Sequence, residues 1–345
     1  MFQAAVGVPA KEGSVRRRML LLTVGQAAPG ILLSACGVGR RRDERAPARE
    51  QPAAVDRALP EGEPGGFAAV PPGTTGGKGG ATVTVSSSDE FVWLLRRPEP
   101  LIIQVSGTLT LPGRMHPVAA NKTIVGIGAT ARLLRGGLRL SQVHNVIIRN
   151  LTFEQAVDDA ITLQDGTHHI WIDHNVFVSA ADGLVDITRQ SSYVTVSWNI
   201  FGRNHDKASL VGNDDNYTAD MGTLRVTYHY NWFQSHSRLP RVRYGQVHVF
   251  NNFYDGVRSY GIASTMSAAV VVEANYFLNT PRPMVVGYGT SSPGDLVERG
   301  NIYVNSGTPE TQGEAFDPSA YYAYRLDDAA DVPSIVRQGA GVGKL

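Results

Sequence analysis

Short runs of β-branched and aromatic residues recur along the second half of the chain, and each run ends in Asn, any residue and an aromatic residue. The Asn positions lie 24, 32, 21, 23 and 26 residues apart. A period of about 25 residues indicates a solenoid or another stacked array. A variant copy surrounds Asn150. The six regular copies are centred on Asn175, Asn199, Asn231, Asn252, Asn275 and Asn301.

The runs are strand-like, because residues 194–196 and 270–272 are rich in Val and Thr and no stretch between the copies shows the periodicity of a helix. A propeller blade would need about 40 residues, and leucine-rich repeats would need Leu at fixed positions. Three short strands with three turns fit a coil of about 25 residues. We therefore predict an all-β fold, a right-handed parallel β-helix.

This fold predicts two ladders and a cleft. An Asn at a bend can bond the Asn of the next coil through its side-chain amide, across a strand spacing of roughly 4.8 Å. The repeated aromatic residue would stack inside the coil. Unequal spacing predicts loop insertions of different length, which in repeat proteins often gather on the binding face. The longest is expected between Asn199 and Asn231, and we expect the loops to form a substrate cleft.

Residues 1–35 are predicted to be a signal peptide of the lipoprotein type. Arg16, Arg17 and Arg18 precede an apolar run that is too short and too interrupted by Gly and Pro to span a membrane. The run ends in residues 33–36 (LSAC), which resemble the bacterial lipobox, whose Cys becomes the lipidated first residue of the mature protein. We expect an exported protein, anchored to the cell envelope only through Cys36, or secreted if the segment is an ordinary cleaved signal.

Residues 36–64 are predicted to be a disordered linker, because clustered Arg, Glu, Pro and Ala leave almost no large apolar residue to bury. Residues 65–345 then form the β-helix domain. The 32 Lys and Arg nearly balance the 31 Asp and Glu, which argues against a nucleic-acid partner. A single Cys excludes a disulfide framework and a thiolate zinc site. We expect a monomer.

Carboxylates recur at one place in the repeat. Asp182 and Asp186 would lie about 13 Å apart on a straight strand, but Gly183 between them permits a turn that brings them together. Asp158 and Asp159 lie one coil earlier, and residues one repeat apart stack sideways in a parallel coil. Stacked carboxylates repel unless a cation lies among them, and oxygen ligands favour Ca²⁺ first and Mg²⁺ second. Turn-capping and surface Asp residues are the alternative.

Basic residues follow the acidic ones. Lys207 lies within the longest insertion, and three Arg occur in the six residues 238–243. Basic groups beside a metal site suit a polyanionic substrate, because a guanidinium group can bind a carboxylate through two parallel hydrogen bonds. A solvated patch, or ion pairs between Arg and Asp, would also explain this composition.

Four motifs together resemble the signatures of the extracellular pectate lyases of the pectate/pectin lyase superfamily. They are residues 171–174 (WIDH), 182–186 (DGLVD), 206–212 (DKASLVG) and 238–245 (RLPRVRYG), in the order and spacing of that family. The resemblance covers about residues 65–345. It implies a β-helix enzyme that cleaves α-1,4-polygalacturonate by Ca²⁺-dependent β-elimination to 4,5-unsaturated oligogalacturonates.

The resemblance also implies roles for particular residues. Carried over position by position, the calcium ligands are Asp159, Asp182 and Asp186, the catalytic base is Arg238, and Lys207 and Arg243 bind substrate carboxylates. The segment that contains His174 is structural in the family, so this residue is not assigned to catalysis. An arginine base is unusual, because guanidinium normally stays protonated. The role requires a cationic neighbourhood, and we expect an alkaline optimum.

One position departs from the family pattern. Some members carry Asp two residues before the first ligand, where this chain has Val157. The neighbouring Asp158 would point the other way on a strand. The calcium site is therefore expected to be weaker, or to depend more on substrate carboxylates.

Three other functions remain open. A pectin lyase would act on methyl esters and would lack this calcium site. A polygalacturonase would hydrolyse its substrate through paired carboxylates about 6.5–9.5 Å apart. A non-catalytic β-helix carbohydrate-binding protein would have no reason to gather Asp, Lys and Arg at these spacings.

Overall fold

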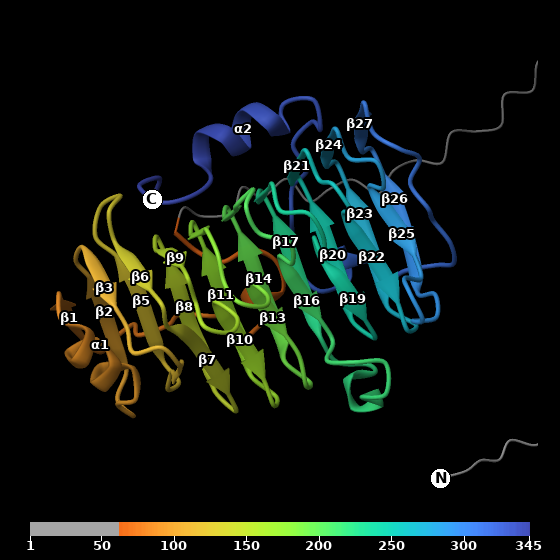
Figure 1. The fold of residues 1–345 in the computed structure, drawn as a ribbon. Helices are drawn as coiled ribbons and strands as arrows, with labels where there is room; N and C mark the ends of the chain where they lie inside the picture. The colour runs from red at the N-terminus through yellow and green to blue at the C-terminus, as the bar shows by residue number, and fades with distance from the viewer. Residues whose placement is uncertain (1–61) are drawn as a thin grey trace, which may run out of the picture. The chain divides into compact units, whose positions relative to one another are not determined.

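The computed structural model describes residues 62–345, which form a parallel β-helix (Figure 1). Each complete coil contributes one strand to each of three sheets, here called sheets A, B and C, and every strand pair within these sheets is parallel. The prediction of a parallel β-helix is confirmed. The predicted signal peptide, Cys36 and nearly all of the predicted linker lie outside the described residues.

Sheet A contains ten strands, in the order β1 (Ala81–Val85), β2 (Leu101–Val105), β5 (Lys122–Gly126), β8 (His144–Arg149), β11 (His168–Asp173), β14 (Ser192–Ser197), β17 (Arg225–His229), β20 (Gln246–Phe250), β23 (Ala269–Glu273) and β26 (Asp295–Arg299). Sheet B contains nine strands: β3 (Thr108–Thr110), β6 (Arg132–Leu134), β9 (Thr152–Glu154), β12 (Val176–Phe177), β15 (Ile200–Phe201), β18 (Trp232–Phe233), β21 (Phe253–Asp255), β24 (Tyr276–Leu278) and β27 (Ile302–Val304). Sheet C contains eight: β4 (Met115–Pro117), β7 (Gly137–Ser141), β10 (Ile161–Gln164), β13 (Val185–Ile187), β16 (Ser209–Val211), β19 (Arg241–Arg243), β22 (Ile262–Thr265) and β25 (Met284–Val286).

The Asn ladder runs along the corner between sheets A and B, as predicted. The side-chain amide of Asn175 donates to Oδ1 of Asn199 at 3.0 Å, and the same bond repeats from coil to coil as far as Asn301. Each acceptor oxygen also binds the backbone N–H of the previous Asn. Such a buried amide is tolerated because all its polar atoms have partners.

The register shows why Asn150 is a variant copy. Arg149 pairs with Asp173 across sheet A, so Asn150 aligns with His174, and Leu151 holds the place of the ladder Asn. Both Asn150 and His174 have positive φ, 57° and 51°, because this is the bending residue of the corner. Asn150 therefore lies one residue before the ladder position, which is why this copy departs from the regular pattern. Its amide instead donates to the carbonyls of Gly126 and Gly128.

The repeated aromatic side chains stack inside the coil along sheet B. Ring centroids of successive residues lie 4.2–5.2 Å apart. Burial of large aromatic side chains is a major source of stability, and stacked pairs add to it. The stack consists of Phe153, Phe177, Phe201, Phe233, Tyr254, Phe277 and Tyr303.

Helices and terminal segments cover the rest of the coil. The helix α1 (Ser88–Leu95) buries Phe91, Leu94 and Leu95 at the N-terminal end, and α2 (Val332–Gly339) packs outside the coil near β21 (Figure 1). Short 3-10 helices occupy Gly66–Ala69, Thr218–Asp220 and Pro318–Ala320. In residues 62–345 no helix has the length and apolarity needed to cross a membrane.

The longest insertion lies at residues 212–224, between β16 and β17. Lys207 precedes β16, and the stretch from β15 to β16 is as long as the stretch from β12 to β13. The prediction that Lys207 lies within the insertion is therefore wrong. Lys207 belongs to the regular turn that leads from sheet B into sheet C, the same kind of turn that carries Asp182 one coil earlier.

Candidate active site

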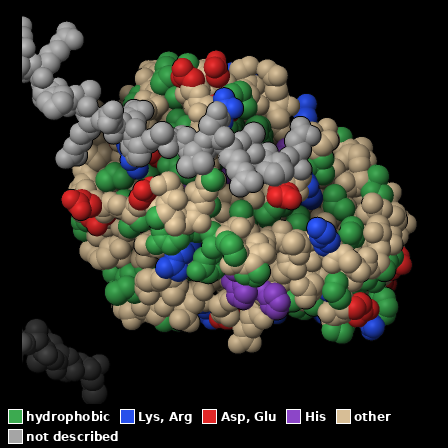
Figure 2. Space-filling model, turned by 180° about the vertical axis from the view of Figure 1, so that it is seen from behind, with side chains coloured by type: hydrophobic (Ala, Val, Ile, Leu, Met, Phe, Trp, Pro, Cys, Tyr) green, Lys and Arg blue, Asp and Glu red, His purple; other side chains and the backbone are tan. Residues whose placement is uncertain are grey.

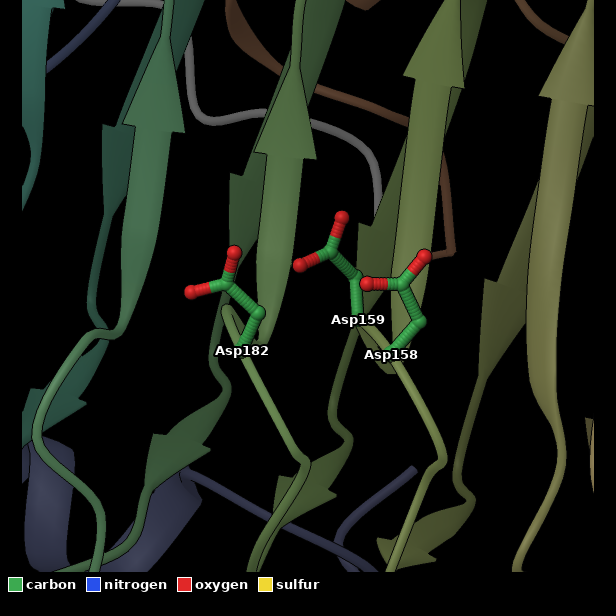
Figure 3. Close-up of side chains that lie close together, drawn as sticks. All are labelled: Asp158, Asp159 and Asp182. Atoms are coloured by element: carbon green, nitrogen blue, oxygen red, sulfur yellow. The ribbon is translucent and has the colours of Figure 1, made fainter.

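Three carboxylates meet where adjacent coils enter sheet C. Asp158 and Asp159 precede β10, and Asp182 precedes β13 on the next coil (Figure 3). One oxygen from each of these residues lies within 4.8 Å of one from each of the others. Two predicted ligands, Asp159 and Asp182, are thus brought together as expected.

Asp158 was expected to point away, and here the structure differs. The strand β10 begins only at Ile161, so residues 157–160 form bends that strand alternation does not govern. Asp158 is exposed and its carboxylate points toward Asp159 and Asp182 (Figure 3). It follows Val157 directly, so the acidic group has a second exposed carboxylate in addition to that of Asp182.

Asp186 lies on β13, buried next to this group. Its Oδ1 accepts a hydrogen bond of 3.2 Å from the backbone N–H of Leu210. A Cβ atom built on Gly183 would collide with Oδ1 of Asp186 and lie 2.9 Å from Oδ1 of Asp159. Both oxygens therefore border a space that only a glycine leaves open. Gly183 has no positive φ, so its predicted role in the turn is replaced by this steric one.

The buried carboxylates resist ionisation. Burial raises the pKa of Asp159, although hydrogen bonds from Thr162 and from the Gly183 N–H oppose the shift. Burial also raises the pKa of Asp186 well above its usual range, and the nearby charge of Asp159 adds to this. Two like charges in a poorly solvated space would be relieved by a cation.

The donor set fits a hard divalent cation. The candidate ligand atoms are all carboxylate oxygens, which suit Ca²⁺ or Mg²⁺ rather than a soft metal. The space that a side chain at position 183 would fill lies between two of these oxygens. The residues that would hold the ion are Asp158, Asp159, Asp182 and Asp186.

Lys207 lies directly against the acidic group. Its Nζ donates to Oδ1 of Asp182 at 2.6 Å, and this bond lowers the pKa of Asp182. Both side chains are about half exposed, so the pair is in contact with solvent. Lys207 is therefore positioned to reach an anionic ligand bound at the acidic group.

Arg238 comes from the turn before β19, two coils after Asp182. Its positive charge opposes the rise in the pKa of Asp186 that burial causes, which places the two groups near one another. Within residues 62–345 the Arg238 guanidinium group makes no hydrogen bond or ion pair to another side chain. It is half-buried and has donors available for a ligand.

Arg241 and Arg243 lie on the same face of β19, because Val242 between them points into the core. Nε of Arg243 donates to Oδ1 of Asp215 at 2.6 Å. Burial lowers the pKa of Arg241, and the positive charges of Arg243 and Arg238 lower it further. The neighbourhood of Arg238 is thus cationic, as an arginine base requires.

Asp215 was not among the site residues predicted from the sequence. It lies in the insertion at residues 212–224, and its only sequence signal was the unusual length of that interval. Figure 2 shows the molecule from behind, where acidic and basic side chains are scattered among hydrophobic and other side chains.

His174 takes no part in this group. It lies at the corner between sheets A and B, where Nδ1 is 2.7 Å from Oδ2 of the buried Asp173. Arg149 pairs with the same carboxylate oxygen at 2.9 Å, and Ser197 donates to the other oxygen at 2.8 Å. These contacts tie neighbouring strands of sheet A together, which agrees with a structural role.

Comparison with known proteins identifies relatives of this chain. A family model described as pectate lyase matches residues 53–345. A pectate trisaccharide-lyase of Thermotoga sp. (strain RQ2) is 40% identical over 332 residues, which covers 82% of this chain and 90% of the relative. Pectate lyase A of Emericella nidulans is 40% identical over 298 residues, covering 83% of this chain and 88% of the relative.

A solved structure shows the same fold with a sugar ligand. The crystal structure of a pectate lyase from Bacillus sp. N165 in complex with trigalacturonate superposes with a TM-score of 0.76 at 34% sequence identity. The match covers 81% of this chain and 99% of the other.

Proposed function

The chain belongs to the pectate lyase family and is a polysaccharide lyase, and from this premise we propose that it cleaves polygalacturonate by Ca²⁺-dependent β-elimination to 4,5-unsaturated oligogalacturonates. The proposal rests on one observation: the group of carboxylates, Lys207 and three Arg lie close together where successive coils enter sheet C. Acidic groups suit the cation, and basic groups suit the uronate chain.

The chemistry follows from where charge develops. The proton to be removed is on C5 of the sugar, next to the uronate carboxylate, so its removal pushes negative charge onto that carboxylate. Arg238, in its neutral guanidine form, takes this proton, and Lys207 and Arg243 hold substrate carboxylates and offset their charge. The C4–O bond then breaks, its electron pair leaves with the oxygen, which takes a proton from water, and a 4,5-unsaturated sugar remains.

The proposed calcium ligands are Asp159, Asp182 and Asp186, with Asp158 close enough to join them. A bound Ca²⁺ would supply positive charge that both orients the substrate carboxylate and stabilises the charge it gains. A bound cation would replace Lys207 as the counter-charge of Asp182, and Lys207 would then be available to the substrate.

The test of the function is the product. We expect purified protein to release unsaturated product from polygalacturonate, measured by the absorbance of the new double bond. Four relatives are named pectate trisaccharide-lyases, so product length should be determined as well. New reducing ends without the double bond would instead indicate a hydrolase. Activity only on highly methylated pectin would indicate a pectin lyase, and binding without cleavage would indicate a carbohydrate-binding protein.

We further propose that the protein is exported and anchored by lipid at Cys36. The support is the order of the arginines, the short apolar run and LSAC in residues 16–36. Residues 37–64 would then tether the enzyme roughly 30 Å from the membrane by random-coil scaling. An enzyme held there would release oligosaccharides close to the cell surface.

For this anchor, we expect Cys36→Ala to move the protein from the detergent-soluble envelope fraction into the medium. The matched control is Ser34→Ala, which changes a neighbouring residue but keeps the Cys that would be lipidated. If wild type and Cys36→Ala both appear as soluble protein in the medium, the segment is only a cleaved signal. The catalytic proposal would stand, because no residue before position 65 enters it.

A further inference from the structure

Asp215 connects three parts of the chain that are far apart in sequence. Its carboxylate accepts from Nε of Arg243 on β19 at 2.6 Å. The same carboxylate accepts from Oγ of Ser291, at 2.7 Å for one oxygen and 2.8 Å for the other. Its backbone carbonyl accepts from the hydroxyl of Tyr244, next to Arg243. The insertion at residues 212–224 is thereby fixed to β19 and to the loop that follows β25.

Ser291 extends the connection to Arg241. The Ser291 hydroxyl donates to Asp215, so its lone pairs are free to accept, and Nη2 of Arg241 donates to it at 2.7 Å. The Arg241 guanidinium group also lies over the ring of Tyr288, 5.3 Å from the centroid. One carboxylate therefore orients two guanidinium groups, one directly and one through a buried hydroxyl.

This arrangement leaves donors free on Arg243. In the described part of the chain the Arg243 side chain donates only through Nε, to Asp215, so both Nη groups keep their hydrogens for another acceptor. Arg241 and Arg243 alternate with the buried Val242 and therefore face the same side of β19. Hydrogen bonds from Arg243 and Ser291 lower the pKa of Asp215 despite its partial burial, so it stays charged.

We propose that Asp215 is a positioning residue for substrate binding: it holds Arg243 and, through Ser291, Arg241 as a fixed pair that binds carboxylates of the galacturonate chain. This inference rests on the proposed function. A long arginine side chain loses much rotamer entropy when it binds, and a residue that orders it beforehand removes that cost from the binding step. Asp215 thus increases the affinity for the substrate and the preference for free carboxylates over methyl esters.

The direction in which substrate affinity changes when Asp215 is replaced distinguishes a positioning role from simple electrostatic repulsion. Removing a negative charge beside a cleft for a polyanion should strengthen binding through reduced repulsion. Removing the residue that orders two arginines should weaken it. Asp214 offers the matched control, because it lies in the same insertion and its side-chain hydrogen bonds are confined to Asn213 and Asn216.

We expect Asp215→Asn to raise KM for polygalacturonate about tenfold while kcat changes less than about twofold. Asp214→Asn removes the same charge and should leave KM unchanged or lower it. The ratio of kcat/KM on polygalacturonate to that on partially methylated pectin should fall in Asp215→Asn alone. In an Arg243→Ala background, Asp215→Asn should have much less further effect, because the two residues act as one unit.

Several results would overturn the inference. If Asp215→Asn shows the same KM as Asp214→Asn, or loses kcat and kcat/KM equally, Asp215 does not position the arginines for binding. Should Asp215→Asn fail to fold by circular dichroism, Ser291→Ala decides. This variant removes only the link to Arg241 and should raise KM about threefold, whereas an unchanged KM rejects the proposal. Absence of lyase activity in the wild type would instead reject the proposed function itself.

Discussion

Arg238→Lys is expected to abolish turnover on polygalacturonate while the β-helix stays folded. Lysine keeps the positive charge but loses the planar guanidinium group and its reach. Arg238 makes no hydrogen bond or ion pair to another side chain in the described part of the chain, so the exchange breaks no such contact there. The proton acceptor at C5 is lost, and kcat should fall by far more than tenfold.

The measurement is kcat from the rate of formation of unsaturated product, with thermal unfolding recorded in parallel. Arg97→Lys is the matched control, since Arg97 is a partly exposed residue near the N-terminal end of the described chain that pairs with Glu99 and lies over the ring of Trp93. Its kcat should equal that of the wild type. If Arg238→Lys keeps more than about a tenth of the wild-type kcat, its activation free energy has risen by less than ~1.4 kcal/mol, and Arg238 is not the base.

Removal of calcium is expected to cause the second large loss of activity. In excess EGTA, the carboxylates of Asp159 and Asp186 have no cation to offset their charge, and the substrate carboxylate loses its partner. Activity should fall to background and return when Ca²⁺ is added in excess of the chelator. Mg²⁺ should restore less activity than Ca²⁺, because it demands a stricter octahedral geometry.

A thermal shift provides a readout that does not depend on activity. Binding to the folded state alone raises its stability by about 2.7 kcal/mol at a hundredfold excess over Kd. Ca²⁺ should therefore raise the Tm of the wild type, and this shift should be lost in Asp159→Asn. Asp165→Asn, at the other end of β10, serves as the control and should retain the shift. Full activity in excess EGTA would rule out the metal role.

The solenoid could be predicted from the sequence because its rules are local and repeated. Strand propensity, the corner Asn and the interior aromatic recur with one period, and each copy has the same neighbours one coil away. The ladder from Asn175 to Asn301 and the aromatic stack followed from that regularity alone. The copy around Asn150 lies outside the ladder because this coil departs from the pattern by a single residue.

The motifs also identified which parts of the chain would gather. Sideways stacking of coils predicted that the carboxylates at residues 158 and 159 would lie beside that of Asp182, because parallel register places equivalent turns side by side. The family resemblance then singled out Asp159, Lys207 and Arg238. The placement of Lys207 in a regular turn was decided by the structure.

The direction of side chains in irregular turns was decided only by the tertiary structure. Asp158 faces the acidic group because residues 157–160 are not a strand, and Gly183 matters for the space it leaves between two oxygens rather than for its φ. Asp215 meets Arg243 and Ser291 across 28 and 76 residues. No period relates these positions, so contacts of this kind depend on how an insertion folds back onto the coil, which the repeat does not encode.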